Sequence, residues 1–175
     1  DKAPLIIAVD LSPSMDADDV APSRLEAVKN KLRDLLKRRE GARTALIAYA
    51  GSAHLVLPPT DDPELLETYI QALSTDLIEK SGKNALAVTD QAIKLLAAEK
   101  GPGTLVLISD GADTDQLKEL SQHLEQSPED LQVLILAVGS QSGGLIKNIN
   151  GSPRLDSSGK PVISEFDKAA LEQLA

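Results

Sequence analysis

Five short apolar runs, separated by stretches of helical periodicity, restrict this chain to an α/β fold. The runs have lengths typical of strands rather than of helices. They cover residues 4–10, 45–50, 53–57, 104–109 and 131–138. Four of them are almost continuously hydrophobic, as expected of strands that are covered on both faces. Only Gly51 and Ser52 separate the second run from the third, a spacing that predicts a tight antiparallel hairpin.

Helical patterns fill the intervals between these runs. Apolar residues recur at helical spacing over residues 25–36, 65–73, 85–96 and 115–125. Strands that alternate with helices are joined by crossover connections, so we predict a mostly parallel central sheet with one antiparallel edge strand and helices on both faces. Arg24 and the basic run 33–39 are expected on the solvated face of the first helix. The run could alternatively dock an acidic partner.

Residues 139–164 differ in composition from the rest of the chain. Gly143-Gly144, Asn150-Gly151 and Ser157-Ser158-Gly159 interrupt its short apolar pieces, which predicts a hairpin-like excursion over the edge of the domain. The length of 175 residues fits one domain, so we assign residues 1–175 to a single unit. The sequence stops inside a helical pattern, and we expect its C-terminal helix to be truncated.

Composition argues against several classes of function. A formal net charge of −9 and an aromatic content of 2% disfavour nucleic-acid binding, which needs a cationic face or stacking platforms. The absence of cysteine excludes disulfides, thiolate metal sites and cysteine nucleophiles. No apolar run approaches the roughly 20 residues that cross a membrane, so membrane attachment would come from segments outside this sequence.

Oxygen-bearing side chains follow two of the predicted strands. The motif Asp10-Leu11-Ser12-Pro13-Ser14 ends the first run, and Ser109-Asp110-Gly111 ends the fourth. Each motif alone is more often a turn or a helix cap, but ligands of open α/β sheets bind at the carboxyl ends of strands. Carboxylate and hydroxyl oxygens suit hard divalent cations. We therefore predict a site for Mg²⁺, or for Mn²⁺ or Ca²⁺, whose ligands are Asp10, Ser12, Ser14 and Asp110.

The first motif matches the D-x-S-x-S signature of the metal-ion-dependent adhesion site, so the chain resembles a von Willebrand factor A domain. Residues 19–25, 49–53 and 57–61 further resemble the bacterial membrane-anchored subgroup, the Bat (aerotolerance) type proteins. The resemblance implies a Rossmann-like sheet in which Ser12 and Ser14 ligate the metal directly, and Asp10 and Asp110 directly or through water. It also implies a partner carboxylate at the remaining coordination position, and a domain tethered to the bacterial inner membrane that faces the periplasm.

One position departs from this family pattern. Where the family supplies a threonine after a glycine, the sequence has Lys83, within Ser81-Gly82-Lys83-Asn84. A charged lysine has no lone pair and cannot ligate a metal. Because a cation relieves the repulsion between two carboxylates, we predict that Lys83 lies near Asp10 or Asp110 as a counter-charge. Two alternatives stay open: Ser81 or Asn84 supplies an oxygen after a shift of the loop, or Lys83 faces solvent.

The sequence thus predicts a non-enzymatic protein-interaction domain that binds an acidic residue of a partner protein through a metal-ion-dependent adhesion site. One alternative is a metal-free scaffold in which Lys83 fills a degenerate site. Another is a Mg²⁺-dependent phosphatase-like enzyme, although such enzymes need a second carboxylate where this chain has Ser12. Phosphate-binding glycine-rich loops are missing from the sequence. His54 and His123 lack neighbouring ligands and are expected at the surface.

The remaining aspartates have structural interpretations. Asp113 and Asp115 suit the N-terminus of the fourth helix, where the helix dipole favours negative charge. Asp16, Asp18 and Asp19 suit a solvated acidic rim and the lead-in to the first helix.

Overall fold

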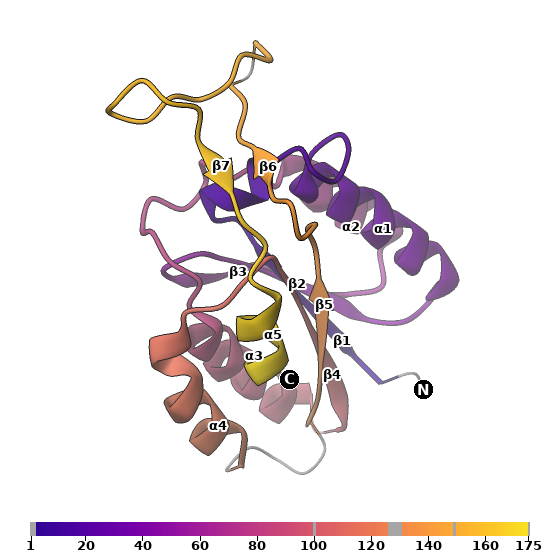
Figure 1. Ribbon diagram of the computed structural model, residues 1–175. Coiled ribbons are helices and arrows are strands. Elements are labelled where there is room, and N and C mark those ends of the chain that lie inside the picture. Colours follow the sequence, from indigo (N-terminus) through magenta and orange to yellow (C-terminus); the bar gives the residue numbers. More distant parts are fainter. Residues whose placement is uncertain (1–2, 100, 126–130, 149, 175) are drawn as a thin grey trace.

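The computed structural model describes residues 3–99, 101–125, 131–148 and 150–174. At its centre lies a five-stranded sheet in the order β3-β2-β1-β4-β5 (Figure 1). The strands are β1 (Leu5–Asp10), β2 (Thr44–Tyr49), β3 (Ala53–Thr60), β4 (Gly103–Ser109) and β5 (Leu131–Ala137). β1 pairs in parallel with β2 and β4, β4 pairs in parallel with β5, and β3 runs antiparallel to β2. The predicted sheet with one antiparallel edge strand is confirmed.

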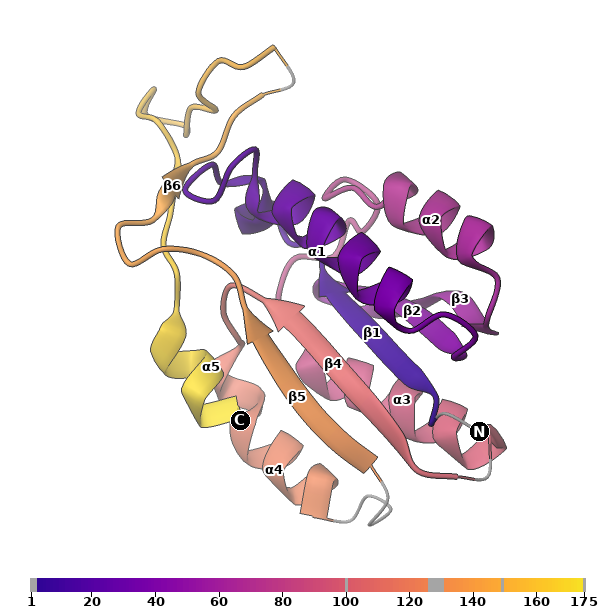
Figure 2. The same cartoon turned by 90° about the vertical axis from the view of Figure 1, so that its right-hand side faces the viewer.

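Helices cover both faces of the sheet, as predicted (Figure 2). α1 (Arg24–Arg38) and α2 (Pro63–Ala72) lie on one face, and α3 (Ala85–Glu99) and α4 (Leu117–Glu125) lie on the other. α5 (Lys168–Leu174) packs beside α4 and β5. Alternate side chains of β1 enter the two cores, with Ile7 and Val9 towards α1 and Ile6 and Ala8 towards α3. Among the described helices, none combines the length and the apolar character needed to cross a membrane.

Side-chain caps fix where the helices of the first face begin. Ser23 accepts a hydrogen bond from the backbone N–H of Glu26 at the start of α1. Asp62 accepts hydrogen bonds from two backbone N–H groups at the start of α2, and Pro63 occupies its first turn. A cap of this kind contributes about 1 kcal/mol. Because this cap fixes the start of α1, it also fixes the position of Arg24, the first residue of that helix.

β5 is an edge strand and is less covered than the other parallel strands. β1 and β2 are buried along their whole length, whereas Leu134 and Leu136 of β5 are about half exposed. In the described part of the chain, the outer side of β5 has no strand beside it. The expectation of a strand covered on both faces therefore does not hold for β5. Leu131 and Val133 pack against the core on the side of α3, whereas Leu134 and Leu136, on the opposite face, belong to neither core.

The chain winds in opposite directions on the two sides of β1, so the switch point lies between β1 and β4, and open α/β sheets bind ligands outside the carboxyl ends of the strands at such a point. The loop after β1 enters η1 (Pro13–Asp16), and the loop after β4 leads to η2 (Thr114–Gln116). Residues 139–164 rise from the same edge as an arm that contains β6 (Gly144–Leu145) and β7 (Ile163–Ser164) (Figure 1). A bridge between Ala17 and Ile146 ties the arm to the first loop. β6 and β7 pair in antiparallel fashion within this arm.

Candidate functional site

Four oxygen-bearing side chains converge at the carboxyl edge of the sheet, and they are the predicted ligands Asp10, Ser12, Ser14 and Asp110. The group at their centre is the ammonium of Lys83. Its Nζ lies 2.8 Å from Asp10 Oδ2, 2.5 Å from Ser12 Oγ, 2.9 Å from Ser14 Oγ and 2.5 Å from Asp110 Oδ1. The predicted proximity of Lys83 to the two carboxylates is confirmed, and the alternative of a lysine that faces solvent is wrong.

The turn after β1 places three of these oxygens. Asp10 is the last residue of β1 and is fully buried, and its Oδ1 accepts a hydrogen bond of 2.7 Å from the backbone N–H of Ser12. Pro13 begins η1, and this turn brings Ser14 Oγ to 3.1 Å from Ser12 Oγ. Alternate residues of the motif therefore present their oxygens to the same point, as the sequence predicted.

The end of β4 supplies the opposite wall. Asp110 follows Ser109, the last residue of β4, and both are buried. Ser109 Oγ donates to Asp10 Oδ2 at 2.6 Å, which links the two strand ends directly. Burial and the charge of Asp10 raise the pKa of the Tyr49 hydroxyl well above its ordinary value, so this group stays neutral beside the carboxylates. Ser109 was quoted in the motif after the fourth run but given no role, and Tyr49 was missed as part of the site because its position in an apolar run indicates core.

Arg24 lies behind the site and is fully buried, which corrects the expectation of a solvated arginine. Its Nε and Nη2 donate to the two carboxylate oxygens of Asp19 at 2.7 and 2.8 Å, and Nη1 donates to Asp110 Oδ2 at 2.8 Å. The remaining donors reach the backbone carbonyls of Ser164 and Glu165. Helical periodicity did not reveal this role, because the first turn of α1 faces the site rather than solvent.

One residue of the acidic rim that we expected, Asp19, is instead part of this buried network. The Asp19 carboxylate accepts hydrogen bonds from Arg24 and from the backbone N–H of Ser140. Burial raises the pKa of Asp19, but these hydrogen bonds outweigh it and lower the pKa to about 2. Asp18 accepts a hydrogen bond from the backbone N–H of Leu145. Both aspartates therefore hold the arm against the first loop. The prediction of a solvated rim is wrong for Asp19, whose side chain is buried, whereas the Asp18 side chain is partly exposed.

The loop that carries Lys83 is held by backbone contacts to the hairpin turn between β2 and β3. Gly51 N–H donates to the carbonyl of Lys80 at 2.8 Å, and Asn84 N–H donates to the carbonyl of Ala50 at 2.7 Å. Lys83 N–H donates to Asp113 Oδ2 at 2.9 Å, a contact that the interpretation of Asp113 as a helix cap did not foresee. The approach at Gly51 is so close that a Cβ there would lie 2.0 Å from the carbonyl oxygen of Ser81.

Lys83 remains charged in this environment. Burial alone would lower the pKa of its amine, but the charges of Asp10 and Asp110 outweigh the desolvation and raise the pKa above its ordinary value. Only 20% of the side chain is exposed. An ammonium has three protons to donate, and here four oxygens surround it, so its donors are fully used.

These residues fit a divalent cation in chemistry but not in the arrangement that the structure has. The two carboxylates and two hydroxyls are the oxygen donors that Mg²⁺ and Ca²⁺ take, at metal–oxygen distances of about 2.0–2.6 Å. The ammonium already lies at hydrogen-bonding distance from all four, so a divalent ion and Lys83 cannot share the position. Across the described ranges, no group of three or more histidine, cysteine, aspartate or glutamate side chains could hold a metal ion. The Mg²⁺ site stays a prediction.

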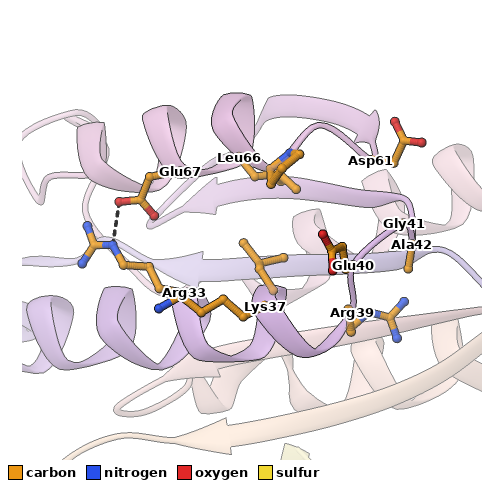
Figure 3. A pocket seen from close by; sticks show the side chains of 11 residues that line it. Arg33, Lys37, Arg39, Glu40, Gly41, Ala42, Asp61, Leu66 and Glu67 are labelled. Carbon is orange, nitrogen blue, oxygen red and sulfur yellow. Dashed lines mark hydrogen bonds and ion pairs between the residues drawn. The ribbon is translucent and has the colours of Figure 1, made fainter.

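The other candidates lie apart from this cluster. His54 hydrogen-bonds to Ser52, and His123 pairs with Asp90; the two histidines are partly exposed or exposed, as expected. The expected basic run lines a groove of about 660 Å³ between α1 and α2, with Leu66 on its α2 side (Figure 3). Arg33 in this run donates to Glu67 across the groove at 2.7 Å, so part of its charge is neutralised within the protein. Docking of an acidic partner at the run stays a prediction.

Comparisons with known proteins agree with the family resemblance that the sequence motifs indicated. Residues 5–112 match the family described as von Willebrand factor type A domain. The conserved hypothetical protein BatB from Bacteroides thetaiotaomicron superposes with a TM-score of 0.87 at 26% identity, covering 99% of this chain and 85% of that one. An aerotolerance-related membrane protein from Bacteroides fragilis gives 0.84 at 28% identity, covering 99% and 87%.

A curated relative, a UPF0353 protein from Mycolicibacterium gilvum, is 33% identical over 120 residues, which is 65% of this chain and 36% of that protein. The chain therefore spans about a third of the length of the curated relatives that it matches.

Proposed function

Because this chain belongs to the von Willebrand factor type A domain family, we propose that it is a protein-interaction domain whose partner docks at the carboxyl edge of the sheet. The observation that carries the proposal is the buried charge cluster at this edge, from which the arm rises. Asp10, Ser12, Lys83 and Asp110 come from three separate loops and are locked together by hydrogen bonds. Such an arrangement gives the edge a fixed shape and charge pattern, which is what recognition of a partner requires.

The same contacts favour binding over catalysis. Asp10 Oδ1 accepts from the Ser12 N–H, and Oδ2 accepts from Lys83 and Ser109. A carboxylate whose oxygens are all engaged by donors is a poor nucleophile, and Ser12 occupies the place of the second carboxylate that a phosphatase needs. We therefore propose a non-enzymatic role, and incubation with a phosphomonoester and Mg²⁺ should give no hydrolysis above background.

Which surface the partner contacts depends on whether Lys83 or a divalent ion occupies the site. A partner carboxylate, as the sequence predicted, would need an open coordination position on a divalent ion. The Lys83 ammonium already faces four oxygens within the protein and has no proton left for such a carboxylate. We therefore propose that the partner contacts the surrounding loops and the arm. As an alternative, we propose that an acidic residue of the partner binds through Mg²⁺ at this site, which requires the Lys83 side chain to leave it.

Crosslinking from the arm tests this function. Leu155 on the arm is 57% exposed, and Leu65 on α2 is 38% exposed, so neither side chain is needed for the core. A photo-crosslinking residue placed at position 155 of the full-length protein in cells should trap a specific protein, whereas the same residue at position 65 should not. With that protein purified, Leu155→Ser should weaken binding at least about tenfold and Leu65→Ser should leave it unchanged. Equal effects of the two variants would contradict docking at this edge.

We also propose that the natural domain is tethered to the bacterial inner membrane and faces the periplasm. Support comes from its likeness to the aerotolerance-related membrane protein from Bacteroides fragilis. The described helices do not include a segment that could act as the tether. The anchor in this proposal therefore lies in sequence outside these 175 residues.

A further inference from the structure

We propose that the ammonium of Lys83 is the resident cation of this site, a covalently attached replacement for a divalent ion that keeps the site assembled and closed to metals. The proposal concerns the domain alone and does not depend on the identity of a partner. It rests on three features of the structure: the position of Nζ, the hydrogen bonds that the carboxylate oxygens already accept, and the way in which the loop of Lys83 is held.

The position of Nζ is that of a bound ion rather than of a surface amine. It lies between 2.5 and 2.9 Å from oxygens of Asp10, Ser12, Ser14 and Asp110, so a single positive centre is surrounded by two carboxylates and two hydroxyls. A lysine in a chance surface ion pair usually contacts one carboxylate and keeps most of its ammonium in water. Here 80% of the side chain is withdrawn from solvent, since its exposed fraction is 20%.

Every oxygen of the two carboxylates already accepts a hydrogen bond from a group within the protein. Arg24 donates to Asp110 Oδ2, and Lys83 donates to Oδ1 of the same group. Asp10 Oδ1 is taken by the Ser12 N–H, and Oδ2 by Lys83 and Ser109. The ammonium of Lys83 and the guanidinium of Arg24 together compensate the carboxylates of Asp10 and Asp110. A divalent ion would therefore have to displace Lys83 and would face the repulsion of Arg24.

The loop of Lys83 holds its backbone in place. Lys83 N–H is bound by Asp113, and the flanking Lys80 and Asn84 are hydrogen-bonded to the turn at Ala50 and Gly51. The side chain therefore reaches Asp10 and Asp110 from a fixed point of the backbone. Removing it would leave Asp10 and Asp110 facing each other with only Arg24 to compensate them, which disfavours the metal-free protein.

Calorimetric and thermal titrations of the 175-residue chain with Mg²⁺ and Mn²⁺ test the inference. Wild type should give no binding heat and the same melting temperature in millimolar Mg²⁺ as in chelator. Lys83→Thr, which removes the ammonium and supplies a hydroxyl, should melt lower in chelator, and should bind the ions at least about tenfold more tightly than wild type and regain stability with them. Lys80→Thr is the matched control, because it removes the same charge from an exposed position of the same loop and should behave as wild type.

A second measurement uses wild type alone and so does not depend on whether the variant folds. In nitrogen-15 spectra of the lysine ammonium groups, Lys83 should show a slowly exchanging resonance that stays unchanged on addition of Mg²⁺. Wild-type protein that binds Mg²⁺ as tightly as Lys83→Thr would overturn the inference, as would loss of that resonance on titration. A Lys83→Thr protein as indifferent to metals as wild type would overturn it as well. None of these results involves the partner, so they are separate from the test of the proposed function.

Discussion

Two cations of different shape share the carboxylate of Asp110. Arg24 donates to one of its oxygens at 2.8 Å, and Lys83 lies 2.5 Å from the other. The planar guanidinium suits Arg24, because the same group also grips both oxygens of Asp19. The compact ammonium suits Lys83, because its four oxygens approach one point from different directions. Exchange of the two residue types would therefore fit neither place.

Arg24 should be a major source of stability. Arg24→Met removes a fully buried guanidinium and leaves Asp19 and part of Asp110 without a counter-charge. Breaking a buried ion pair from one side costs about 3–5 kcal/mol, so the free energy of unfolding in urea should fall by an amount of that size. Arg33→Met is the control, because it removes an exposed pair with Glu67 that contributes at most about 1 kcal/mol. Similar losses in the two variants would show that the buried network does not stabilise the fold.

For single residues, the sequence predicted the side chains that accept hydrogen bonds in the site, but it missed most of the side chains that donate them. Asp10, Ser12, Ser14 and Asp110 were grouped correctly, because short motifs at strand ends have fixed geometry. Lys83 was placed near them because it stands where the family has a threonine. The burial of Arg24 followed no local pattern, since it depends on how the loop after β1 folds back and on where the arm returns.

The hairpin of β2 and β3 forms one edge of the sheet, and its turn also positions the loop of Lys83. Its turn at Gly51 contacts the loop directly, and the space there admits no side chain. The site is thus built on the regular elements beneath it, and a change in the turn is transmitted to the ammonium through backbone atoms.

Gly51→Ala should therefore disturb the site without altering any of its side chains. The added methyl would lie 2.0 Å from the carbonyl oxygen of Ser81, so the loop must move away. Overpacking of this kind typically costs about 1–3 kcal/mol, and the same variant should speed hydrogen exchange of the Lys83 ammonium. Gly101→Ala is the control, because nothing lies within 4 Å of a Cβ there. An unchanged ammonium resonance in Gly51→Ala would show that the turn does not position the loop.

The elements themselves were largely predictable. α1, α2 and α3 occupy the predicted stretches, and the hairpin follows from the two residues between its strands. β5 was less predictable, because its apolar run resembles that of β4, while Leu134 and Leu136 on one face of it lie outside both cores. Hydrophobicity along a run reports the composition of a strand, and it does not report whether helices cover both of its faces.

For the whole molecule, the alternation of strands and helices predicted the class of sheet but not the order of its strands. In this order the switch point of the sheet lies between β1 and β4, and the two motifs begin at the ends of these strands. The two motifs are a hundred residues apart in sequence, so only the complete sheet brings Asp10 and Asp110 together. The arm joins the same edge through Asp18 and Asp19.

The proposed membrane tether gives a prediction for the full-length protein. It should fractionate with the inner membrane, and protease added to spheroplasts should digest this domain while leaving cytoplasmic markers intact. Its parent sequence should contain at least one apolar segment of about 20 residues beside the domain. A full-length protein recovered among the cytoplasmic markers would rule out both the tether and the periplasmic orientation.

Because the Lys83 ammonium is part of the chain, the site can form under conditions in which a site that depends on a divalent ion could not. A divalent ion arrives by diffusion, so its occupancy follows its free concentration. The Lys83 ammonium arrives as the loop at residues 80–84 closes onto the strand ends, and its effective concentration is set by the tether. The site is then completed in a first-order step of folding, whatever ions the medium holds. Dilution or a chelating environment would leave the edge of this domain with the same charges and the same shape.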